Sequence, residues 1–482
     1  MRAVGDGAAS AYGRPRRPFS RRLGVTLAAC FVVVSLCGPA AAQSLTPGGF
    51  EIDVHNGPVL GSSRMIGLGG AYSAVAADAS GVAWNPASYA SRELWETSWF
   101  AWDVSAGILL PSTTSSRGDF DNNGDASVGY GGFLYGDLAL GVQLGAFGFG
   151  VLLRSFAYEA QVGEQNVSVG LTTGNYGLGY GFLDGQVVVG GGARTAAFTV
   201  RTGGEALLQL AGTAPEIGAQ VRLAGRPWRI GAAYRAGLSV DYEPTGAAAA
   251  IARPRPRAAH LPWELQLGVA YQFGDRPLNR RFIDPGRAED ALAARYEARR
   301  RARVREQLQR ERAAGRTVGT EPTDPRWLAE EADRVVAEDA ELERDVAYAA
   351  LRRAAELRAL SRRYVLVTGE VVVTGATRDG IGLEGYLWGR PDPAGRNVTT
   401  SVRLGVELEP WFERLKLRAG GYFEPSRFAG VAGRMHATAG IDVRLGAWDL
   451  FGLAPDTSWR VSLVADVARR YFDWGVGIGV WH

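Results

Sequence analysis

Cysteine and histidine are scarce in this 482-residue sequence, which contains two cysteines and four histidines. Both cysteines, Cys30 and Cys37, fall within the first 42 residues, a segment that we expect to be removed from the mature protein. The remaining chain would then have no thiol, which excludes a disulfide-stabilised scaffold and a metal site with cysteine ligands. Apolar runs of about 20 residues, the length that a membrane helix needs, are also lacking after residue 42.

The first 42 residues have the pattern of a signal peptide. Several arginines precede an apolar run over residues 23–36, and three alanines at residues 40–42 provide the small residues of a cleavage site. We therefore expect the mature chain to begin at Gln43. Removal of residues 1–42 takes away six arginines and Asp6, which leaves 47 of the 53 basic and 49 of the 50 acidic residues. This near-neutral balance offers no basic field for nucleic acid.

Catalytic motifs are also missing. The four histidines, His55, His260, His436 and His482, are far apart in the sequence, and no Gly-x-Ser-x-Gly, His-Glu-x-x-His or phosphate-binding loop is present. The sequence nominates neither a nucleophile nor a general base. We therefore expect no enzymatic activity, no catalytic residues and no required cofactor.

What the sequence does contain is strict alternation of apolar and polar residues. In residues 263–273 (WELQLGVAYQF), the apolar side chains share one face of an extended chain and the polar or small ones share the other. The apolar faces carry aromatic residues near the segment ends, as the interfaces of membrane barrels do. About fourteen such segments are expected, from 94–284 and 363–482. The predicted fold is an all-β transmembrane barrel of antiparallel strands in the bacterial outer membrane, and a soluble β protein is the alternative.

Charged residues on the other face of the last strands would then point into the barrel. Opposite charges on neighbouring strands stabilise a sheet through cross-strand pairs, and a field that selects a carboxylate head group is the functional alternative. This expected lumen-charge network consists of Arg403, Glu407, Lys416, Arg418, His436, Asp442 and Arg444.

The segment that follows the signal peptide is unusually small and apolar. Residues 67–90 read GLGGAYSAVAADASGVAWNPASYA, with Asp78 as the sole charge. This string resembles the N-terminal hatch of FadL-type outer-membrane transporters of hydrocarbons and long-chain fatty acids. The resemblance implies a plug over residues 43–93 and a ligand that enters from outside, shifts the plug and leaves sideways through the wall. A simple turn before the first strand is the alternative. The residues that carry the resemblance are Gly69, Gly70, Ala71, Asp78, Trp84, Asn85, Pro86 and Ala87.

Residues 285–362 interrupt the strand pattern. They are rich in Ala, Arg and Glu, and Pro322 and Pro325 divide them into two expected helices, 286–315 and 326–362. The first helix has an excess of basic residues and the second an excess of acidic ones, which favours an antiparallel hairpin. Because eight strands precede it, we expect this hairpin to lie in the periplasm. It is either a solvated decoration or a docking arm for a periplasmic partner or the cell wall.

One further motif resembles a calcium-binding loop. Asp119, Asp121, Asn123 and Asp125 alternate around a glycine, but Tyr130 stands where the bidentate glutamate of an EF-hand would be. An ordinary loop rich in Asp and Asn is the alternative to a calcium site.

Two functions compete on these grounds. The first is passive uptake of hydrophobic small molecules, such as long-chain fatty acids, through a barrel plugged by the hatch, with an apolar pocket between the plug and the upper wall. The second is a FadL-like barrel that serves as a platform for secretion or assembly and binds a protein through the helical insertion. The sequence does not identify the ligand.

Overall fold

The computed structural model describes residues 49–111, 118–125, 130–162, 165–203, 205–241, 255–360, 363–390, 392–447 and 457–481. The predicted signal peptide and cleavage site lie outside these residues. The expected start of the mature chain at Gln43 lies outside them as well.

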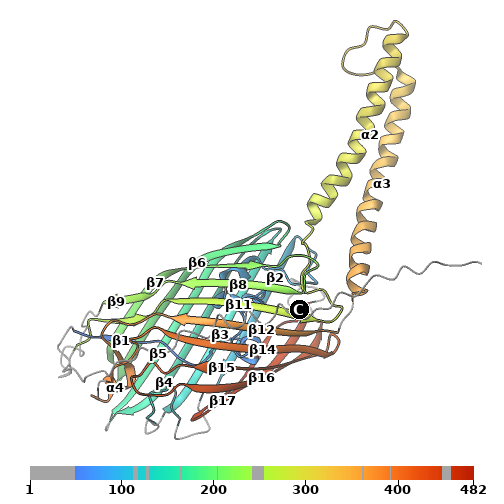
Figure 1. The fold of residues 1–482 in the computed structure, drawn as a ribbon. Helices are drawn as coiled ribbons and strands as arrows, with labels where there is room; N and C mark the ends of the chain where they lie inside the picture. The colour runs from blue at the N-terminus through green and yellow to red at the C-terminus, as the bar shows by residue number, and fades with distance from the viewer. Residues whose placement is uncertain are drawn as a thin grey trace, which may run out of the picture. The chain divides into compact units, whose positions relative to one another are not determined.

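Fourteen antiparallel strands form a closed barrel (Figure 1), as the alternation predicts. Around the ring the order is β11-β12-β14-β15-β16-β17-β18-β2-β3-β4-β5-β6-β7-β8. The ring closes where β18 pairs with β2, from Gly475 opposite Leu109 to Gly479 opposite Ser105. The strands are β2 (Phe100–Leu109), β3 (Tyr130–Leu144), β4 (Phe147–Val162), β5 (Gln165–Phe182), β6 (Val187–Thr202), β7 (Glu205–Val221), β8 (Trp228–Arg235), β11 (Glu264–Phe273), β12 (Val365–Thr374), β14 (Thr399–Trp411), β15 (Leu415–Glu424), β16 (Arg434–Ala447), β17 (Ser458–Ala468) and β18 (Tyr471–Val480).

The two faces of the wall differ as the sequence predicts. On β11, Leu267 and Phe273 are 52% and 56% exposed on the outer face, whereas Gln266 and Gln272 are buried inside. A closed sheet leaves no unpaired strand edge, so it can cross a bilayer with every backbone group of the wall paired. An apolar outer surface with a polar interior is the pattern of transmembrane barrels. The wall therefore has the properties of a barrel that spans a membrane.

Connections between strands differ at the two ends of the barrel. At one end, called here the short-turn end, β3 joins β4 through residues 145–146 and β5 joins β6 through residues 183–186. In the turn at residues 145–146, Gly145 adopts the positive φ of 57° that such a tight turn requires. At the opposite, long-loop end, residues 236–263 and 375–398 make much longer connections.

Part of the long loops forms a small sheet with the N-terminal described residues. Its order is β13 (Gly380–Gly382), β1 (Glu51–Asp53), β10 (Ala258–Leu261) and β9 (Leu238–Asp241). A short helix, α4 (Leu383–Leu387), follows β13. The chain therefore starts its described course at the long-loop end.

From β1 the chain passes through the barrel to β2, whose first residue lies at the short-turn end. This stretch, residues 54–99, is called the hatch segment, and almost all of residues 58–92 are buried. It contains α1 (Ser63–Gly67) and two turns of 3₁₀ helix, η2 (Ala79–Ala83) and η3 (Pro86–Ala90). The small residues of 67–90 fit a segment that packs against the wall on all sides.

Two long helices, α2 (Pro285–Ala313) and α3 (Pro325–Arg358), are inserted between β11 and β12 (Figure 1). Each has an aspartate cap, Asp284 or Asp324, followed by proline at its first position. Charged pairs connect the helices, among them Arg300 with Glu338 at 2.9 Å and Arg303 with Glu331 at 2.7 Å. Among the described residues, no helix has both the length and the apolar character to cross a membrane.

Candidate functional site

Asn85 joins two parts of the hatch segment to the barrel wall. Its Nδ2 donates to the carbonyl oxygens of Ser73 at 2.9 Å and Ala219 on β7 at 3.1 Å, and its Oδ1 accepts from the amide of Ala87 at 3.0 Å. Pro86 starts η3 with its fixed φ, and Asn85 before it is extended. The asparagine that carries the hatch resemblance is thus a fully buried structural connector.

Glycines on the lumen face of the wall receive the hatch backbone. A Cβ on Gly190 of β6 would lie 2.8 Å from the amide nitrogen of Ala87, and one on Gly231 of β8 would lie 2.6 Å from that of Ala74. On the opposite wall, a Cβ on Gly405 of β14 would lie 2.5 Å from the carbonyl oxygen of Leu68. These distances are too short for any side chain, so close backbone approach explains the glycines.

Gly69 and Gly70 of the hatch segment have φ of 61° and 74°, a conformation that residues with a side chain rarely adopt. They turn the chain between α1 and Ala71, which is itself fully buried. Nearby, the indole of Trp84 donates to the carbonyl oxygen of Gly70 at 3.0 Å. These contacts make the glycine pair part of the folded core of the hatch segment.

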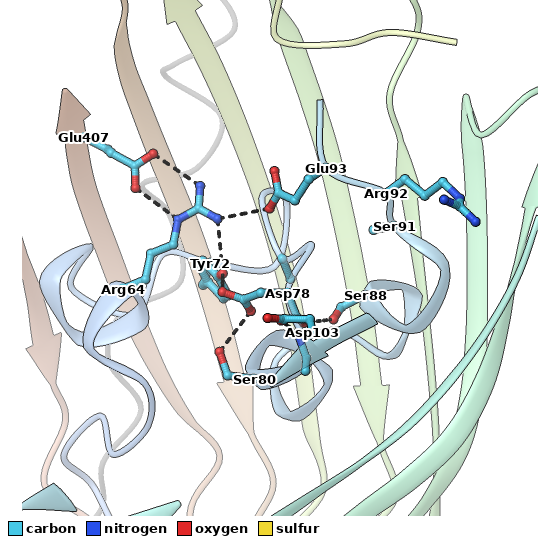
Figure 2. A network of polar contacts seen from close by, with 12 residues as sticks. Arg64, Tyr72, Asp78, Ser80, Ser88, Ser91, Arg92, Glu93, Asp103 and Glu407 are labelled. Atoms are coloured by element: carbon cyan, nitrogen blue, oxygen red, sulfur yellow. Dashed lines mark hydrogen bonds and ion pairs between the residues drawn. The ribbon is translucent and has the colours of Figure 1, made fainter. Parts of the chain in front are cut away.

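Asp78 is the centre of a polar network inside the hatch segment (Figure 2). Its carboxylate accepts from Tyr72 Oη and Ser80 Oγ, both at 2.9 Å, and its backbone oxygen accepts from Ser88 Oγ at 2.6 Å. The amide of Ala79 donates to Asp103 on β2 at 2.6 Å. The single acid that the sequence places in residues 67–90 therefore holds the small-residue segment in one conformation.

A chain of alternating charges connects the hatch segment to the wall. Arg64 of α1 forms two hydrogen bonds to Glu407 of β14, with its Nε 3.0 Å from Oε2 (Figure 2). Arg418 of β15 is 2.6 Å from the same carboxylate and 2.7 Å from Asp442 of β16. All four charges are at least three-quarters buried, and each has an opposite charge beside it.

The chain of charges returns to the hatch segment through β17. Arg460 is 3.7 Å from Asp442 and 3.9 Å from Asp78. Tyr72, which donates to Asp78, also lies within 3.5 Å of the Arg64 guanidinium. The side chains therefore form a closed circuit, called the charge ring, whose charged members are Arg64, Glu407, Arg418, Asp442, Arg460 and Asp78.

The other residues of the expected lumen-charge network lie apart from this ring. Arg403 donates to the carbonyl oxygen of Gly70 at 3.4 Å. His436 bonds to Asp466 at 2.8 Å and to Glu424 at 2.6 Å. These contacts place Arg403 against the hatch segment and His436 in a separate polar cluster.

Two further members of the expected set lie nearer the ends of their strands. Lys416 is buried, with its ammonium 4.6 Å from the centre of the Trp481 ring. Arg444 lies at the short-turn rim and pairs with Glu413 at 2.9 Å. Arg444 is thus outside the network because it lies near the end of β16, at the rim of the barrel.

Arg64 and Glu370 are among the lumen charges that lie outside the expected network. Glu370 on β12 accepts from the amides of Tyr72 at 3.1 Å and Ser73 at 2.7 Å. It is the one charged residue of the strand VLVTGEVVVT. A single charge in an apolar strand could have indicated a lumen position from the sequence. Arg64 could not be found in this way because the hatch segment has no strand periodicity.

A cavity of about 150 Å³ lies between the hatch segment and the wall. One side is apolar and includes Trp84, Phe156 and Leu171. The sequence predicts an apolar pocket between the plug and the wall, and this cavity has charged side chains as well as apolar ones. The charged side chains are Arg154, Arg194, Arg235, Arg403 and Glu264.

A smaller cavity of about 50 Å³ continues towards the long loops. It shares Phe156 and Leu171 with the first cavity and also reaches Leu383 and Phe428 in the long loops. The two cavities therefore outline a route from the long-loop end to the hatch segment.

The loop that resembles a calcium site uses its oxygens internally. Asp119 accepts from the amides of Asn123 at 3.0 Å and Gly124 at 3.1 Å, and Asn123 accepts from the amide of Asp125 at 2.6 Å. Asp121 also accepts from the Asn123 amide. Within the part of the chain that the structure describes, no group of three or more Asp, Glu, His or Cys side chains is arranged to hold a metal ion.

The same loop packs against α4 through acidic groups, which predicts a dependence on pH. Burial, together with the nearby Asp119 carboxylate, raises the pKa of Asp121 to about 8, and burial also raises the pKa of Glu384 well above its usual range. Because the folded state favours the protonated acids, the loop contact is most stable below about pH 4 and loses stability as the pH rises through about 8.

We expect faster hydrogen exchange in residues 118–125 at pH 9 than at pH 6, after correction for intrinsic rates. The variant Glu384→Gln should reduce this difference, whereas Glu159→Gln, an exposed acid on β4, should leave it unchanged. An equal difference in all three proteins would contradict the prediction.

The closed ring, the apolar outer surface and the buried charges define a class, the transmembrane β-barrels of the bacterial outer membrane, here with an N-terminal segment inside the lumen. No protein-family model and no curated protein matches the sequence. The similarities to solved structures lie in the fold.

A FadL homologue from Pseudomonas aeruginosa is 11% identical, with 90% of this chain and 99% of that chain covered and a TM-score of 0.45. The CymD monoaromatic hydrocarbon channel is 10% identical, with coverage of 87% and 96% and a TM-score of 0.44. A mutant of the TodX monoaromatic hydrocarbon channel is 10% identical, with coverage of 86% and 97% and a TM-score of 0.41. The fold assignment rests on the strand order of this chain.

Proposed function

We propose that this barrel is a passive outer-membrane transporter for hydrophobic small molecules with an anionic head group, for which long-chain fatty acids are the model substrate. One observation carries the proposal: the cavity beside the hatch segment combines an aromatic and aliphatic side with four arginines and one glutamate. Apolar walls with a few placed polar groups are typical of ligand sites. Arginine is also suited to carboxylates because of its planar fork of donors.

In this proposal the long-loop end faces the outside and the short turns face the periplasm, as in other outer-membrane barrels. The ligand enters through the two connected cavities and reaches the hatch segment. Displacement of that segment then opens the way onward. Neither the cavity nor the charge ring requires a reaction of the ligand, so the proposed role is transport and not catalysis.

The cationic side of the cavity gives a direct test. Arg154 makes one hydrogen bond to a side chain, to Asn175 at 3.1 Å, and Arg194 donates to the carbonyl oxygen of Ala236 at 3.0 Å. We expect the double variant Arg154→Gln, Arg194→Gln to reduce uptake of oleate about tenfold, because a charge-assisted hydrogen bond contributes roughly 1.5–3 kcal/mol. Uptake of a neutral alkane should change less than twofold. Both rates are measured in proteoliposomes.

A matched control is Arg201→Gln, which removes an exposed arginine from the long-loop end of β6. Its oleate uptake should equal that of the unaltered protein. Equal losses of oleate and alkane uptake in the double variant would count against recognition of an anionic head group. No uptake of either compound by the unaltered protein would reject transport itself.

A second function, docking of a periplasmic protein, is favoured by the surface of α3. Val336, Tyr348 and Leu351 are 70%, 68% and 70% exposed on this helix, although each is apolar or aromatic. A photo-crosslinking residue at position 348 in the full chain should capture one defined partner in cells if this function holds. The same residue at position 341, which is exposed but acidic in the native chain, should not.

A further inference from the structure

A cavity of about 210 Å³ lies at the short-turn end, well away from the cavity beside Trp84. Three parts of the chain form it: the end of the hatch segment at residues 90–96, the turns at residues 145–146 and 183–185, and the segment at residues 278–287 that leads into α2. We call it the rim pocket. This last segment connects β11 to the helical insertion and contributes Arg287 of α2 to the pocket.

Two buried arginines of the rim pocket, Arg92 and Arg222, are held by backbone carbonyl oxygens. Arg92 donates to the carbonyl oxygens of Gly145, Ser98 and Trp99 at 2.7–2.9 Å. Arg222 donates to the carbonyl oxygen of Arg92 at 2.6 Å. Within the described part of the chain, neither guanidinium has an acid within 4.0 Å. Buried cations held by neutral oxygens alone are costly unless an anion approaches them.

Three more arginines of the pocket, Arg280, Arg281 and Arg287, are accessible. The described residues offer no side-chain hydrogen bond or ion pair to any of the three. They are free to meet a ligand.

The acids of the pocket are for the most part engaged elsewhere. Glu93 faces Arg64 at 3.6 Å, Glu96 accepts from the amide of Ser98, and Asp284 caps α2 through the amide of Gly286. Asp184 is the remaining carboxylate of the lining. The lining thus has five arginines against four carboxylates, one of which, Glu93, also faces Arg64 outside the lining, so the pocket has an excess of positive charge.

The apolar side of the rim pocket is continuous with the outer surface of the barrel. Tyr180 lines the pocket and has the register of the outward-facing Tyr176 and Leu178 on β5. Its ring lies 4.6 Å from that of Phe147 and 4.7 Å from that of Phe182, two exposed side chains of the outer face. Leu183, also in the lining, is 69% exposed. An acyl chain in the bilayer could therefore reach the pocket directly.

We propose that the rim pocket binds a phospholipid with an anionic head group from the adjacent membrane leaflet. The phosphate lies against Arg280, Arg281 and Arg287, and the acyl chain follows Tyr180 and Leu183. Arginine groups recognise phosphate through paired charge-assisted hydrogen bonds, and basic pockets beside membrane segments are a known form of lipid recognition. The bound lipid would link the end of the hatch segment to the base of α2.

Native mass spectrometry tests this proposal on the full-length protein. The purified barrel is delipidated and offered equal amounts of phosphatidylglycerol and phosphatidylcholine with matched acyl chains. The unaltered protein should retain phosphatidylglycerol in excess. The triple variant Arg280→Gln, Arg281→Gln, Arg287→Gln should reduce that excess about tenfold, since it removes three charge-assisted contacts.

Two controls separate this site from other effects. Arg295→Gln, Arg305→Gln, Arg326→Gln removes the same charge from exposed positions on α2 and α3 and should keep the excess. The variant Arg154→Gln, Arg194→Gln alters the lumen cavity and should also keep it, whatever its uptake activity. An equal retention of the two lipids by the unaltered protein, or an undiminished excess in the rim variant, would overturn the proposal. Displacement of phosphatidylglycerol by oleate would also overturn it, because the pocket would then hold the transported amphiphile.

Discussion

Replacing Gly190 with alanine should detach η3 of the hatch segment from the barrel wall while the barrel itself stays closed. The added methyl group would meet the carbonyl group of Pro86 and the amide of Ala87, which are backbone atoms that have no rotamer by which to move away. Overpacking of this kind costs about 1–3 kcal/mol, and a backbone clash belongs at the upper end. That value corresponds to a rise of about a hundredfold in the undocked population.

Protease sensitivity and permeability measure this outcome. Cleavage within residues 67–90 of the reconstituted protein should become at least tenfold faster, and small solutes should leak through the proteoliposomes. The neighbouring Gly191 provides the control, because a Cβ there would lie 3.5 Å from its nearest atom, the carbonyl oxygen of Glu216. If Gly190→Ala and Gly191→Ala behave alike, wall glycines do not hold the hatch segment.

The second large effect is expected at Glu407, the carboxylate that Arg64 and Arg418 share. The variant Glu407→Gln leaves both guanidinium groups with less compensating charge in a buried place. Removal of one partner from a buried ion pair typically costs about 3–5 kcal/mol. We expect the urea midpoint of the barrel in detergent to fall clearly, and the hatch segment to become exposed to protease at lower urea than the wall.

The partly exposed pair of Arg444 and Glu413 supplies the comparison for this prediction. Glu413→Gln removes a similar carboxylate from the short-turn rim, where an ion pair is worth about 0–1 kcal/mol. A second variant, Glu407→Gln with Arg64→Met, removes one of the two cations that Glu407 pairs with and should recover part of the lost stability. Equal urea midpoints for Glu407→Gln and Glu413→Gln would show that the charge ring does not stabilise the barrel.

The wall of this protein could be predicted from the sequence because its physics is local. Alternate residues of each strand face the membrane and the lumen. The alternation in residues 263–273 therefore predicts both an extended conformation and the side chains that face outward. The lumen positions of Arg403, Glu407 and Asp442 followed from the same rule. The rule fails at strand ends, where Arg444 has the correct parity but lies at the rim.

The arrangement inside the barrel could not be predicted in the same way because its partners are distant in sequence. The backbone of Pro86 leaves no room for a side chain at Gly190, and the backbone of Leu68 leaves none at Gly405. Nothing in the sequence of either strand identifies those neighbours. Arg64 likewise finds Glu407 across 343 positions. The hatch string could be recognised only as a resemblance, since irregular backbone has no period to read.

The path of the N-terminal residues has a consequence for biogenesis. β1 pairs with β10 and β13 at the long-loop end, whereas the same chain leaves the lumen at the short-turn end to begin β2. If β18 had already paired with β2, the N-terminal segment could enter the lumen only by passing a free end through the whole closed barrel. Pairing of β18 with β2 after residues 54–99 are in place avoids this passage, so we expect closure of the barrel to be the last step of its assembly.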